Sequence, residues 1–366
     1  MKIIHVAPFF SNSGSSGGSY SVAFNLARAL GAKGNQVILV SHSRGEGFQS
    51  IIHKNFREMV CDSVLMSKKL DPSSFLPTRR FGEILKEIST CNVLHVHLSR
   101  DIFPTLCCVF GLFMRKKVIL QCHGMIISDQ RILIRVLDFL VYKHVFKFAF
   151  RVLVLTEFES KRIPFHVKDP ILFGNGVLEF KTDFEGFVKK NEIIFVGRIN
   201  NVKRLDMFIK IVAKYNDIYP DTLPSKIFGP DGGALNTTLS NYQSLLGDKI
   251  TYEGPISNSE ILDILSSSKL LLVTSAFENF PMVVVESFAA GTPVLIYSHF
   301  DIAPLISEYF PEMVTEESDY ESLAHRIHLL TELSEVAAYR AKIVNFAKEK
   351  FDINKLCNEL QESIYE

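Results

Sequence analysis

Short, uninterrupted runs of apolar residues alternate with helical patterns along the chain, and this alternation constrains the fold more than any other feature. Runs that are continuous, rather than alternating with polar residues, are typical of parallel strands covered on both faces. Helical periodicity fills the intervals between them. The candidate strands of the first half are 3–8, 37–40, 93–96, 118–120 and 152–155. The pattern predicts an open, doubly wound α/β sheet.

The series begins again after a polar, charged segment at 181–191. Candidate strands follow at 193–196, 226–228, 250–252, 270–274 and 293–296, with helices expected at 204–214, 258–267 and 283–290. A chain of 366 residues is long enough for two domains. We therefore expect two Rossmann-like domains with a ligand cleft between them. The predicted division is an N-terminal domain at 1–180, a linker at 181–191, a second domain at 192–345, and a C-terminal helix at 346–366 that packs back on the first domain.

The charge of the chain is balanced overall but unevenly placed. There are 40 Lys and Arg against 40 Asp and Glu, so the total gives no reason to expect a nucleic-acid partner. Residues 1–180 hold 23 bases against 13 acids, and the remainder holds 17 against 27. The basic half is expected either to meet an anionic partner or to face an acidic neighbouring domain.

The cysteines and the apolar segments indicate a cytoplasmic protein. None of the six cysteines stands in a CxxC pair, and most lie in apolar runs, so neither a disulfide framework nor a zinc site is expected. Residues 1–6 have the pattern of a buried strand and lack the basic start of a signal peptide. No uninterrupted apolar run reaches the ~18 residues of a membrane-spanning helix. The nearest candidate, 132–150, is interrupted by Arg135, Asp138, Lys143, His144 and Lys147.

A glycine-rich turn, Gly14-Ser15-Ser16-Gly17-Gly18-Ser19, follows the first predicted strand and precedes the first helix. Glycines let the backbone approach a ligand closely, and a helix N-terminus offers unpaired N–H groups to an anion. A dinucleotide-binding domain would carry an acid at the end of its second strand to hold a ribose. This chain has Val40-Ser41-His42 there, which disfavours a dehydrogenase. A phosphate or a sugar acceptor remains as the expected ligand of the turn.

Two cations follow the first strand of the second half, in the segment Gly197-Arg198-Ile199-Asn200-Asn201-Val202-Lys203. Arg198 offers a bidentate fork and Lys203 a point charge, and because they are five positions apart, both can converge on a diphosphate. The alternative is a solvated loop with two surface bases.

Two acids eight residues apart form the most specific pattern. Glu278 follows a predicted strand, and Glu286 lies inside an apolar helix, where an ionised carboxylate is costly unless it is hydrogen-bonded. Glu286 is thus a candidate acceptor for sugar or ribose hydroxyls. The alternative is that Glu286 is a core residue paired with a lysine or with the backbone. Residues 279–283 open the same helix, whose free N–H groups suit a phosphate.

Three separated motifs, in the same order and spacing, resemble the family-four glycosyltransferases, also called glycosyl transferases group 1. They are Phe195-Val196-Gly197-Arg198 with Lys203, the Glu278 and Glu286 pair, and Ser287-Phe288-Ala289-Ala290-Gly291-Thr292-Pro293-Val294. The resemblance extends over nearly the whole chain. It implies a GT-B fold, sugar transfer from a nucleotide-sugar with retention of the anomeric configuration, and no essential metal or other cofactor.

The resemblance also implies residue roles. Glu286 would hold the donor ribose, Glu278 would contact the transferred sugar, and Arg198 with Lys203 would neutralise the diphosphate. His123, in Gln121-Cys122-His123-Gly124, would lie near the donor sugar and acceptor, although a histidine at a strand end is more often structural. The remaining predicted donor-binding residues are Gly17, Gly18, Asn279, Met282, Val283 and Ile256. The family often has Glu-Gly where this chain has Glu278-Asn279, and a glycine pair near Ser298-His299-Phe300-Asp301 is absent.

The expected partners are a nucleotide-sugar donor and a glycan or lipid-linked acceptor, as in surface polysaccharide or glycolipid synthesis. A nucleotide-sugar epimerase and a non-catalytic nucleotide-sugar or glycan-binding protein remain as alternatives. The segment 131–147 combines bases one helical turn apart with apolar residues on the other faces, which indicates either docking on an anionic membrane or a buried helix. Another basic patch, for example Arg115-Lys116-Lys117, is an alternative site for such docking. Docking would place the protein peripherally on the inner face of the membrane.

Overall fold

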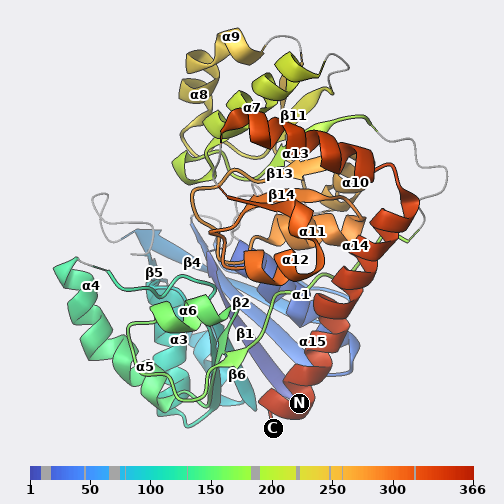
Figure 1. Cartoon of the computed structure of the whole chain (residues 1–366). Coiled ribbons are helices and arrows are strands. Elements are labelled where there is room, and N and C mark those ends of the chain that lie inside the picture. The colour runs from blue at the N-terminus through green and yellow to red at the C-terminus, as the bar shows by residue number, and fades with distance from the viewer. Residues whose placement is uncertain are drawn as a thin grey trace. The chain divides into compact units, whose positions relative to one another are not determined.

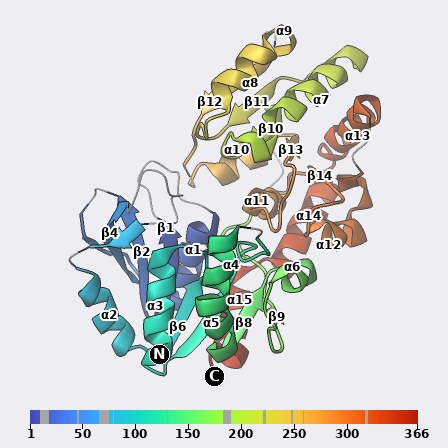
Figure 2. The ribbon, with the colours of Figure 1, turned by 90° about the vertical axis from the view of Figure 1, so that its left-hand side faces the viewer.

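The computed structural model describes residues 1–9, 18–44, 47–65, 75–78, 80–129, 131–182, 190–219, 223–246, 249–257, 259–316 and 319–366. Contacts divide the chain into two compact units, which are drawn in Figures 1 and 2. Unit 1 comprises Met1–Leu178 with Ile353–Glu366, and unit 2 comprises Glu179–Asp352. Among the described residues, no helix is both long enough and apolar enough to cross a bilayer.

Unit 1 is built on one largely parallel sheet in the order β3-β4-β2-β1-β6-β7-β8-β9, with β5 paired to the side of β4. Only β3 and β5 run antiparallel to their neighbour among these strands. The strands are β1 (Lys2–Phe9), β2 (Gln36–Arg44), β3 (Gln49–Ile52), β4 (Arg57–Leu65), β5 (Phe75–Pro77), β6 (Val93–His97), β7 (Lys117–Gln121), β8 (Arg151–Val154) and β9 (Ile171–Leu172). The middle six residues of β1 are all buried, because helices cover both faces of the sheet.

The helices of unit 1 pack in two groups against this sheet. Helices α1 and α15 contact each other, and α3 contacts both α2 and α5. Helices α4, η2 and α5 follow one another without a break and form one helical arm on the outside of the unit (Figure 2). The bounds are α1 (Gly18–Ala32), α2 (Phe81–Ser89), α3 (Ile102–Phe113), α4 (Ile132–Leu137), η2 (Asp138–Tyr142), α5 (Lys143–Phe148), α6 (Glu157–Arg162), α15 (Ile353–Glu359) and η5 (Leu360–Ile364).

Unit 2 has a fully parallel sheet in the order β12-β11-β10-β13-β14-β15. Its strands are β10 (Ile193–Val196), β11 (Ser225–Phe228), β12 (Ile250–Gly254), β13 (Leu270–Leu272), β14 (Val294–Tyr297) and β15 (Val314–Thr315). Its helices are η3 (Asn201–Lys203), α7 (Leu205–Ile218), α8 (Leu235–Asn241), α9 (Gln243–Leu246), α10 (Ile261–Ser267), α11 (Met282–Ala290), α12 (Ala303–Tyr309), η4 (Pro311–Met313), α13 (Tyr320–Leu333) and α14 (Ala337–Lys350).

The predicted doubly wound α/β architecture is confirmed in both units. The predicted first domain 1–180 and second domain 192–345 can be compared with the contact division, which falls between Leu178 and Glu179. In the predicted linker 181–191, residues 183–189 lie outside the described part of the chain. The predicted C-terminal segment 346–366 is divided: its first seven residues belong to unit 2, whereas Ile353–Glu366 belongs to unit 1.

Hydrogen bonds connect the last fourteen residues to the rest of unit 1. The Ile353 backbone N–H donates to the carbonyl of Val177 at 3.1 Å, and the Lys33 ammonium donates to Asn358 Oδ1 at 2.6 Å. The Tyr365 hydroxyl lies 2.7 Å from Nδ1 of His95, on β6. The C-terminus therefore adds side chains to the core of a sheet formed early in the sequence.

Candidate functional site

The carboxyl ends of three neighbouring strands in unit 2 are joined by backbone hydrogen bonds. The N–H of Gly197, after β10, donates to the carbonyl of Phe228 at 3.0 Å, and the N–H of Gly229, after β11, donates to the carbonyl of Gly254 at 2.8 Å. A Cβ at Gly229 would lie only 1.9 Å from the carbonyl oxygen of Gly197, so this approach requires glycine. Gly197, Gly229 and Gly254 thus lie at the carboxyl ends of β10, β11 and β12, where ligands of such folds bind.

Arg198 is exposed and its stem packs closely against a neighbouring turn. The N–H of Ile199 donates to the carbonyl of Pro230 at 2.9 Å, and the N–H of Gly232 donates to the carbonyl of Ile199 at 2.8 Å. A Cβ at Gly232 would lie 2.9 Å from Cγ of Arg198, which shows how tightly the arginine stem is placed. This packing fixes the start of the Arg198 side chain at the carboxyl edge of the sheet.

Lys203 and Glu278, 75 residues apart in sequence, form an ion pair. The hydroxyl of Ser275 donates a second hydrogen bond to the Glu278 carboxylate at 2.7 Å. The backbone at Lys203 is held from two sides: its N–H donates to Asn200 Oδ1 at 3.1 Å, and its carbonyl accepts from the Thr274 hydroxyl at 3.1 Å. The structure therefore brings together a cation and an acid that the sequence placed in separate motifs.

Helix α11 and the residues just before it carry four more of the predicted donor-binding residues. Asn279 is buried just before the helix, and Met282 and Val283 form its half-buried first turn. This turn has no acidic side chain, and Pro281 provides no side-chain cap. The N–H of Val284 donates to the carbonyl of Pro281 at 3.0 Å, whereas the N–H groups of Met282 and Val283 have no acceptor among the described residues and would suit an anion. Glu286 lies one turn further along the same helix.

The carboxyl group of Glu286 is removed from solvent. Burial raises the pKa of the Glu286 carboxyl to about 7, because desolvation disfavours its charged form. Among the described residues, no hydrogen bond or ion pair to this carboxyl is recorded. An acid paired with a lysine or with backbone was the alternative interpretation, and the described part of the chain offers no such pairing. Glu286 is accordingly an acceptor with its hydrogen-bonding capacity still open.

Two further predicted donor-binding segments lie at helix and strand ends. Ile256 is half-buried, two residues after β12. Gly18 is the first residue of α1, whose first turn also lacks an acidic side chain. Gly17, together with the rest of the glycine-rich turn before Gly18, lies outside the described residues.

His123 follows β7 in unit 1 and has a left-handed backbone, with φ of +52°. The next residue, Gly124, is also left-handed, and its N–H donates to the buried carboxylate of Glu159. That carboxylate also accepts from the N–H of Leu155 at 2.6 Å. An uncommon backbone conformation is thus stabilised by a buried acid, which fixes the position of the histidine.

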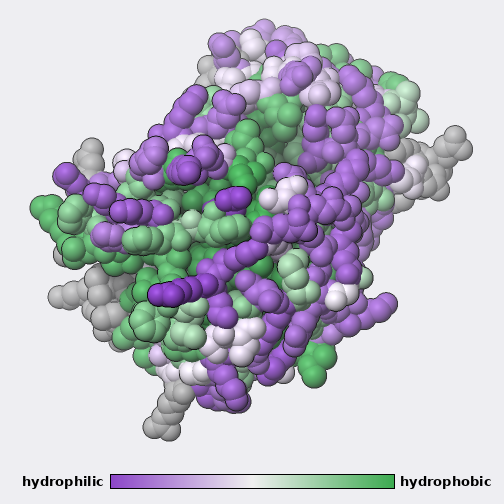
Figure 3. Space-filling view, turned by 90° about the horizontal axis from the view of Figure 1, so that it is seen from below, coloured by the Kyte–Doolittle hydropathy of each residue, from purple (hydrophilic) through white to green (hydrophobic). Residues whose placement is uncertain are grey.

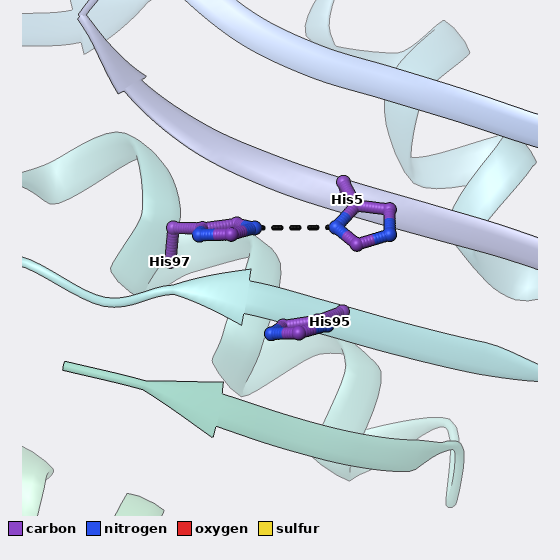
Figure 4. A group of neighbouring side chains, drawn as sticks. All are labelled: His5, His95 and His97. Atoms are coloured by element: carbon purple, nitrogen blue, oxygen red, sulfur yellow. Dashed lines mark hydrogen bonds between the residues drawn. The ribbon is translucent and has the colours of Figure 1, made fainter. Parts of the chain in front are cut away.

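His123 is one of four neighbouring histidines in unit 1. His5 comes from β1 and His95 and His97 from β6, and all three are fully buried (Figure 4). The distances are 3.2 Å from His5 Nδ1 to His97 Nε2 and 2.7 Å from His97 Nδ1 to His123 Nε2. Burial lowers the pKa of His95 and of His123 to about 3, and it holds the pKa of His5 and His97 well below 6.5. The four imidazoles are therefore neutral at physiological pH.

The geometry of this cluster favours hydrogen bonds over metal coordination. Ligand atoms of His5, His95 and His97 lie within 4.8 Å of one another, so we tested whether one ion would satisfy all three. The rings of His95 and His97 are stacked, with an angle of 4° between their planes, so their in-plane lone pairs run parallel instead of converging. Both nitrogens of His95 are also already hydrogen-bonded, to Tyr365 and to Gln121.

Several of these residues were missed by reasoning from the sequence. Ser275 and Thr274 carry no signal that separates them from any polar pair at a strand end. The histidines do carry one, because His95 and His97 are two apart in a strand and so share one face of the sheet. A polar pair on one face of an otherwise apolar strand marks a buried polar cluster.

Two family models match the chain, and together they extend over most of it. Residues 16–170 match the model described as Glycosyltransferase Family 4, and residues 179–350 match Glycosyl transferases group 1. A D-inositol 3-phosphate glycosyltransferase from Mycobacterium sp. (strain KMS) is 24% identical over 163 residues, 43% of this chain and 36% of the relative. The match therefore spans about a third of that relative's length.

Another relative and one solved structure extend the comparison. A GalNAc-alpha-(1->4)-GalNAc-alpha-(1->3)-diNAcBac-PP-undecaprenol alpha-1,4-N-acetyl-D-galactosaminyltransferase from Campylobacter jejuni is 26% identical over 200 residues, 54% of this chain and 51% of the relative. The crystal structure of HepE from Anabaena, in complex with UDP and glucose, superimposes with a TM-score of 0.72 over 100% of this chain and 99% of that chain, at 15% identity. Two family models in sequence order, on a GT-B fold, show that the chain belongs to family four of the glycosyltransferases.

Proposed function

We propose that this chain transfers a sugar from a nucleotide-sugar donor to a glycan or lipid-linked acceptor, and that it retains the anomeric configuration. The observation that carries the donor assignment is Glu286, a half-buried acid without a described partner, one turn into a helix whose first N–H groups are open. A ribose supplies the hydroxyl donors that such a carboxyl lacks, and the diphosphate supplies the anion that suits the helix start. The UDP complex of the similar fold makes uridine nucleotides the first donors to test.

The other residues of unit 2 complete the proposed donor site. Arg198 and Lys203 balance the charge of the diphosphate, and Glu278, held by Ser275, receives hydroxyls of the transferred sugar. Because Lys203 already pairs with Glu278, its ammonium group would connect the phosphate and sugar ends of the donor. Asn279, Met282, Val283 and Ile256 would line the nucleotide.

The proposed reaction breaks the bond between the anomeric carbon and the diphosphate and forms a bond from the same carbon to an acceptor oxygen. Retention requires the acceptor oxygen to approach on the face from which the diphosphate leaves. Its proton then passes to the departing phosphate oxygen, so no separate base is needed. Positive charge from Arg198 and Lys203 stabilises the leaving diphosphate in the transition state, and no metal or other cofactor takes part.

Acceptor-dependent release of nucleoside diphosphate tests this function. The protein is incubated with UDP-sugars and other nucleotide-sugars, with and without soluble glycans or polyprenyl-diphosphate-linked glycans. A transferase releases diphosphate only when an acceptor is present. An epimerase alters the sugar without any acceptor, and a binding protein leaves the donor intact in both arms. Either of these two results would refute the proposal.

We further propose that the acceptor is lipid-linked and that unit 1 meets it on an anionic membrane. The Campylobacter relative is named for an undecaprenol-linked glycan, and the helical arm α4-η2-α5 has the composition of a membrane-surface helix. Its exposed apolar side chains include Ile132 at 76%, Phe139 at 62%, Leu140 at 61% and Phe148 at 62%. In the view of Figure 3, apolar and hydrophilic residues are mixed on the side of unit 1 that carries this arm.

Basic residues are interleaved with these apolar side chains. Arg131, Arg135, Lys143 and Lys147 are all exposed, and the arm buries only its inner face, with Asp138 and Tyr142. The alternative of a fully buried helix therefore does not hold. A cavity of about 430 Å³ opens beside the arm, lined by Arg135, Phe139, Lys143, Phe165 and His166 among others. Two acids also line it, but Asp138 pairs with Arg100 at 2.9 Å and Asp129 pairs with Arg131 at 2.8 Å. Arg135 and Lys143 could therefore meet a lipid phosphate group there.

Vesicle sedimentation tests the membrane proposal. The protein should sediment with phosphatidylglycerol vesicles at low salt and not with neutral phosphatidylcholine vesicles. Each base near an anionic surface contributes about 1 kcal/mol, so binding should fall steeply once the Debye length is below ~8 Å. Phe139→Ser with Leu140→Ser should abolish sedimentation, whereas Phe113→Ser, on α3 and 81% exposed, should not. Equal loss in both variants, or no sedimentation of the parent, would overturn the proposal.

A further inference from the structure

Three imidazoles form a continuous hydrogen-bonded chain from the core of unit 1 to the turn after β7. His5 is the buried end, His97 is the middle member, and His123 is the outer end, at contacts of 3.2 Å and 2.7 Å. Figure 4 shows the inner contact, with the His5 and His97 rings pointing toward each other across neighbouring strands. Unlike the other two, His123 retains some exposure, and no partner is recorded for its Nδ1 among the described residues.

Each member of the chain carries one proton, because burial keeps all three imidazoles neutral. A neutral imidazole donates through one nitrogen and accepts through the other. Once the proton of one ring is placed, the hydrogen bonds determine the protons of the other two. Only two arrangements satisfy both contacts, and they differ at the ends of the chain.

In the first arrangement His5 Nδ1–H donates to His97, whose Nδ1–H donates to His123, leaving His123 with its proton on Nδ1. In the second, every hydrogen bond is reversed, and His5 must then carry its proton on Nε2. That nitrogen is fully buried and has no hydrogen-bond partner among the described atoms. A buried donor without an acceptor is rarer in proteins than a buried acceptor without a donor. The first arrangement is therefore the more stable one.

We propose that His97 and His5 are positioning residues that hold His123 as a hydrogen-bond donor through Nδ1–H, the nitrogen that has no partner among the described residues. In this state His123 donates to an oxygen atom of a ligand and does not accept a proton from it. The functional consequence rests on the proposed sugar transfer, in which the acceptor proton passes to the leaving phosphate and His123 has no proton to remove. A hydroxyl or phosphate oxygen of the donor or acceptor is the ligand group that fits a neutral N–H donor.

His95 lies beside the chain but belongs to a separate set of hydrogen bonds. Its Nε2–H donates to Gln121 Oε1 at 3.2 Å, and its Nδ1 accepts from the Tyr365 hydroxyl at 2.7 Å. Gln121 in turn donates to Asn175 Oδ1 at 3.4 Å. Tyr365→Phe therefore removes a buried hydrogen bond near the chain without touching any of its members, and it serves as the matched control.

The proton positions are measured by nitrogen NMR on the full chain labelled with ¹⁵N-histidine. Protonated and bare imidazole nitrogens resonate at well-separated frequencies, so the spectrum reports the tautomer of His123 without any substrate. We expect His123 to carry its proton on Nδ1 in the parent and in Tyr365→Phe. A proton on Nε2 of His123, or an even mixture of the two tautomers, would overturn the proposal.

Two conservative variants separate positioning from mere packing. The amide of His97→Asn reaches the place of Nδ1, next to His123, whereas the amide of His97→Gln reaches the place of Nε2, next to His5. Asn should preserve the His123 tautomer and Gln should lose it. With a confirmed donor and acceptor, kcat of the Gln variant should fall about tenfold, the equivalent of one hydrogen bond, while the Asn variant stays near the parent.

The NMR tautomer and the kcat of sugar transfer test separate parts of the proposal. If the parent transfers no sugar at all, the proposed function fails and the tautomer result still decides the hydrogen-bonded chain. If His97→Gln keeps both the tautomer and the full kcat, His97 is not a positioning residue. If the tautomer changes and kcat does not, His123 contacts no reacting group, and the functional part of the proposal is wrong.

Discussion

Mild acid should destabilise unit 1 through its buried histidines. His5, His95 and His97 are fully buried, and the pKa of each lies far below the value of 6.5 expected in an unfolded chain. The unfolded state therefore binds more protons than the folded state once the pH falls below 6.5. The contribution of these neutral imidazoles to the free energy of unfolding is fully present above pH 6.5. It is lost progressively as the pH falls toward 3.

The size of the loss follows from the unfolded pKa alone, because the folded imidazoles stay neutral over most of this range. Each one reduces the free energy of unfolding by about 0.8 kcal/mol at pH 6 and about 2 kcal/mol at pH 5. Three of them together amount to about 6 kcal/mol at pH 5. A typical domain has only about 5–15 kcal/mol of stability, so unit 1 should approach its unfolding midpoint near pH 5.

Hydrogen exchange followed by mass spectrometry can measure this in unit 1 alone. Peptides from β1 and β6, corrected for the intrinsic pH dependence of exchange, should lose protection between pH 7 and pH 5. His5→Leu removes one titrating group, so the free energy of opening of unit 1 should change less with pH in this variant than in the parent. The difference in slope should be about 1.4 kcal/mol per pH unit below pH 6. His144→Gln, at an exposed position of α5, should keep the slope of the parent.

An unchanged slope in His5→Leu would contradict the reasoning. It would mean that His5 already binds a proton in the folded state, or that the cluster opens to water before the unit unfolds. Either result would also remove the basis for a chain of neutral imidazoles.

Four other outcomes are expected in unit 2. Glu286→Ala should weaken nucleoside diphosphate binding about 10- to 150-fold, from loss of charged hydrogen bonds worth roughly 1.5–3 kcal/mol, and calorimetry showing parental affinity would exclude the ribose role. Because the pKa of Glu286 is about 7 and the ionised form is the better acceptor, parental affinity should rise between pH 6 and pH 8, and this rise should vanish in Glu286→Gln. Arg198→Lys and Lys203→Met should lower kcat more than they raise the KM for donor, a split that a purely structural role would not produce. Turnover should survive a chelator, and a strict need for added divalent metal would rule out the metal-free reaction.

The sequence was sufficient to predict the two sheets because their central strands are continuous apolar runs. It did not predict β4, since Arg57–Leu65 contains Arg57, Glu58 and Asp62 and lacks that signature. The short strands β9 and β15 have two residues each, too few for any periodicity. Their pairing depends on the neighbouring strand, which is tertiary information.

Within the candidate site, the sequence identified charged residues but not their partners. Lys203 and Glu278 were both predicted to bind the donor, yet their ion pair depends on the order β10-β13 in the sheet, which places the ends of two distant strands next to each other. The chain His5–His97–His123 was missed for the same reason, since β1, β6 and β7 are neighbours only in space. His123 itself was predicted from the family motif, but its left-handed turn and its support from Glu159 were not.

The central claim is that unit 2 binds a nucleotide-sugar through Glu286, and a thermal-shift panel of nucleoside diphosphates and nucleotide-sugars tests it most directly. Binding to the folded state alone raises stability by about 2.7 kcal/mol at a ligand concentration 100 times Kd. We predict that one nucleoside diphosphate and its sugar conjugates raise the Tm of the parent, and that the shift is largely lost in Glu286→Ala. No shift with any member of the panel at millimolar concentration, or an equal shift in parent and variant, would contradict the account.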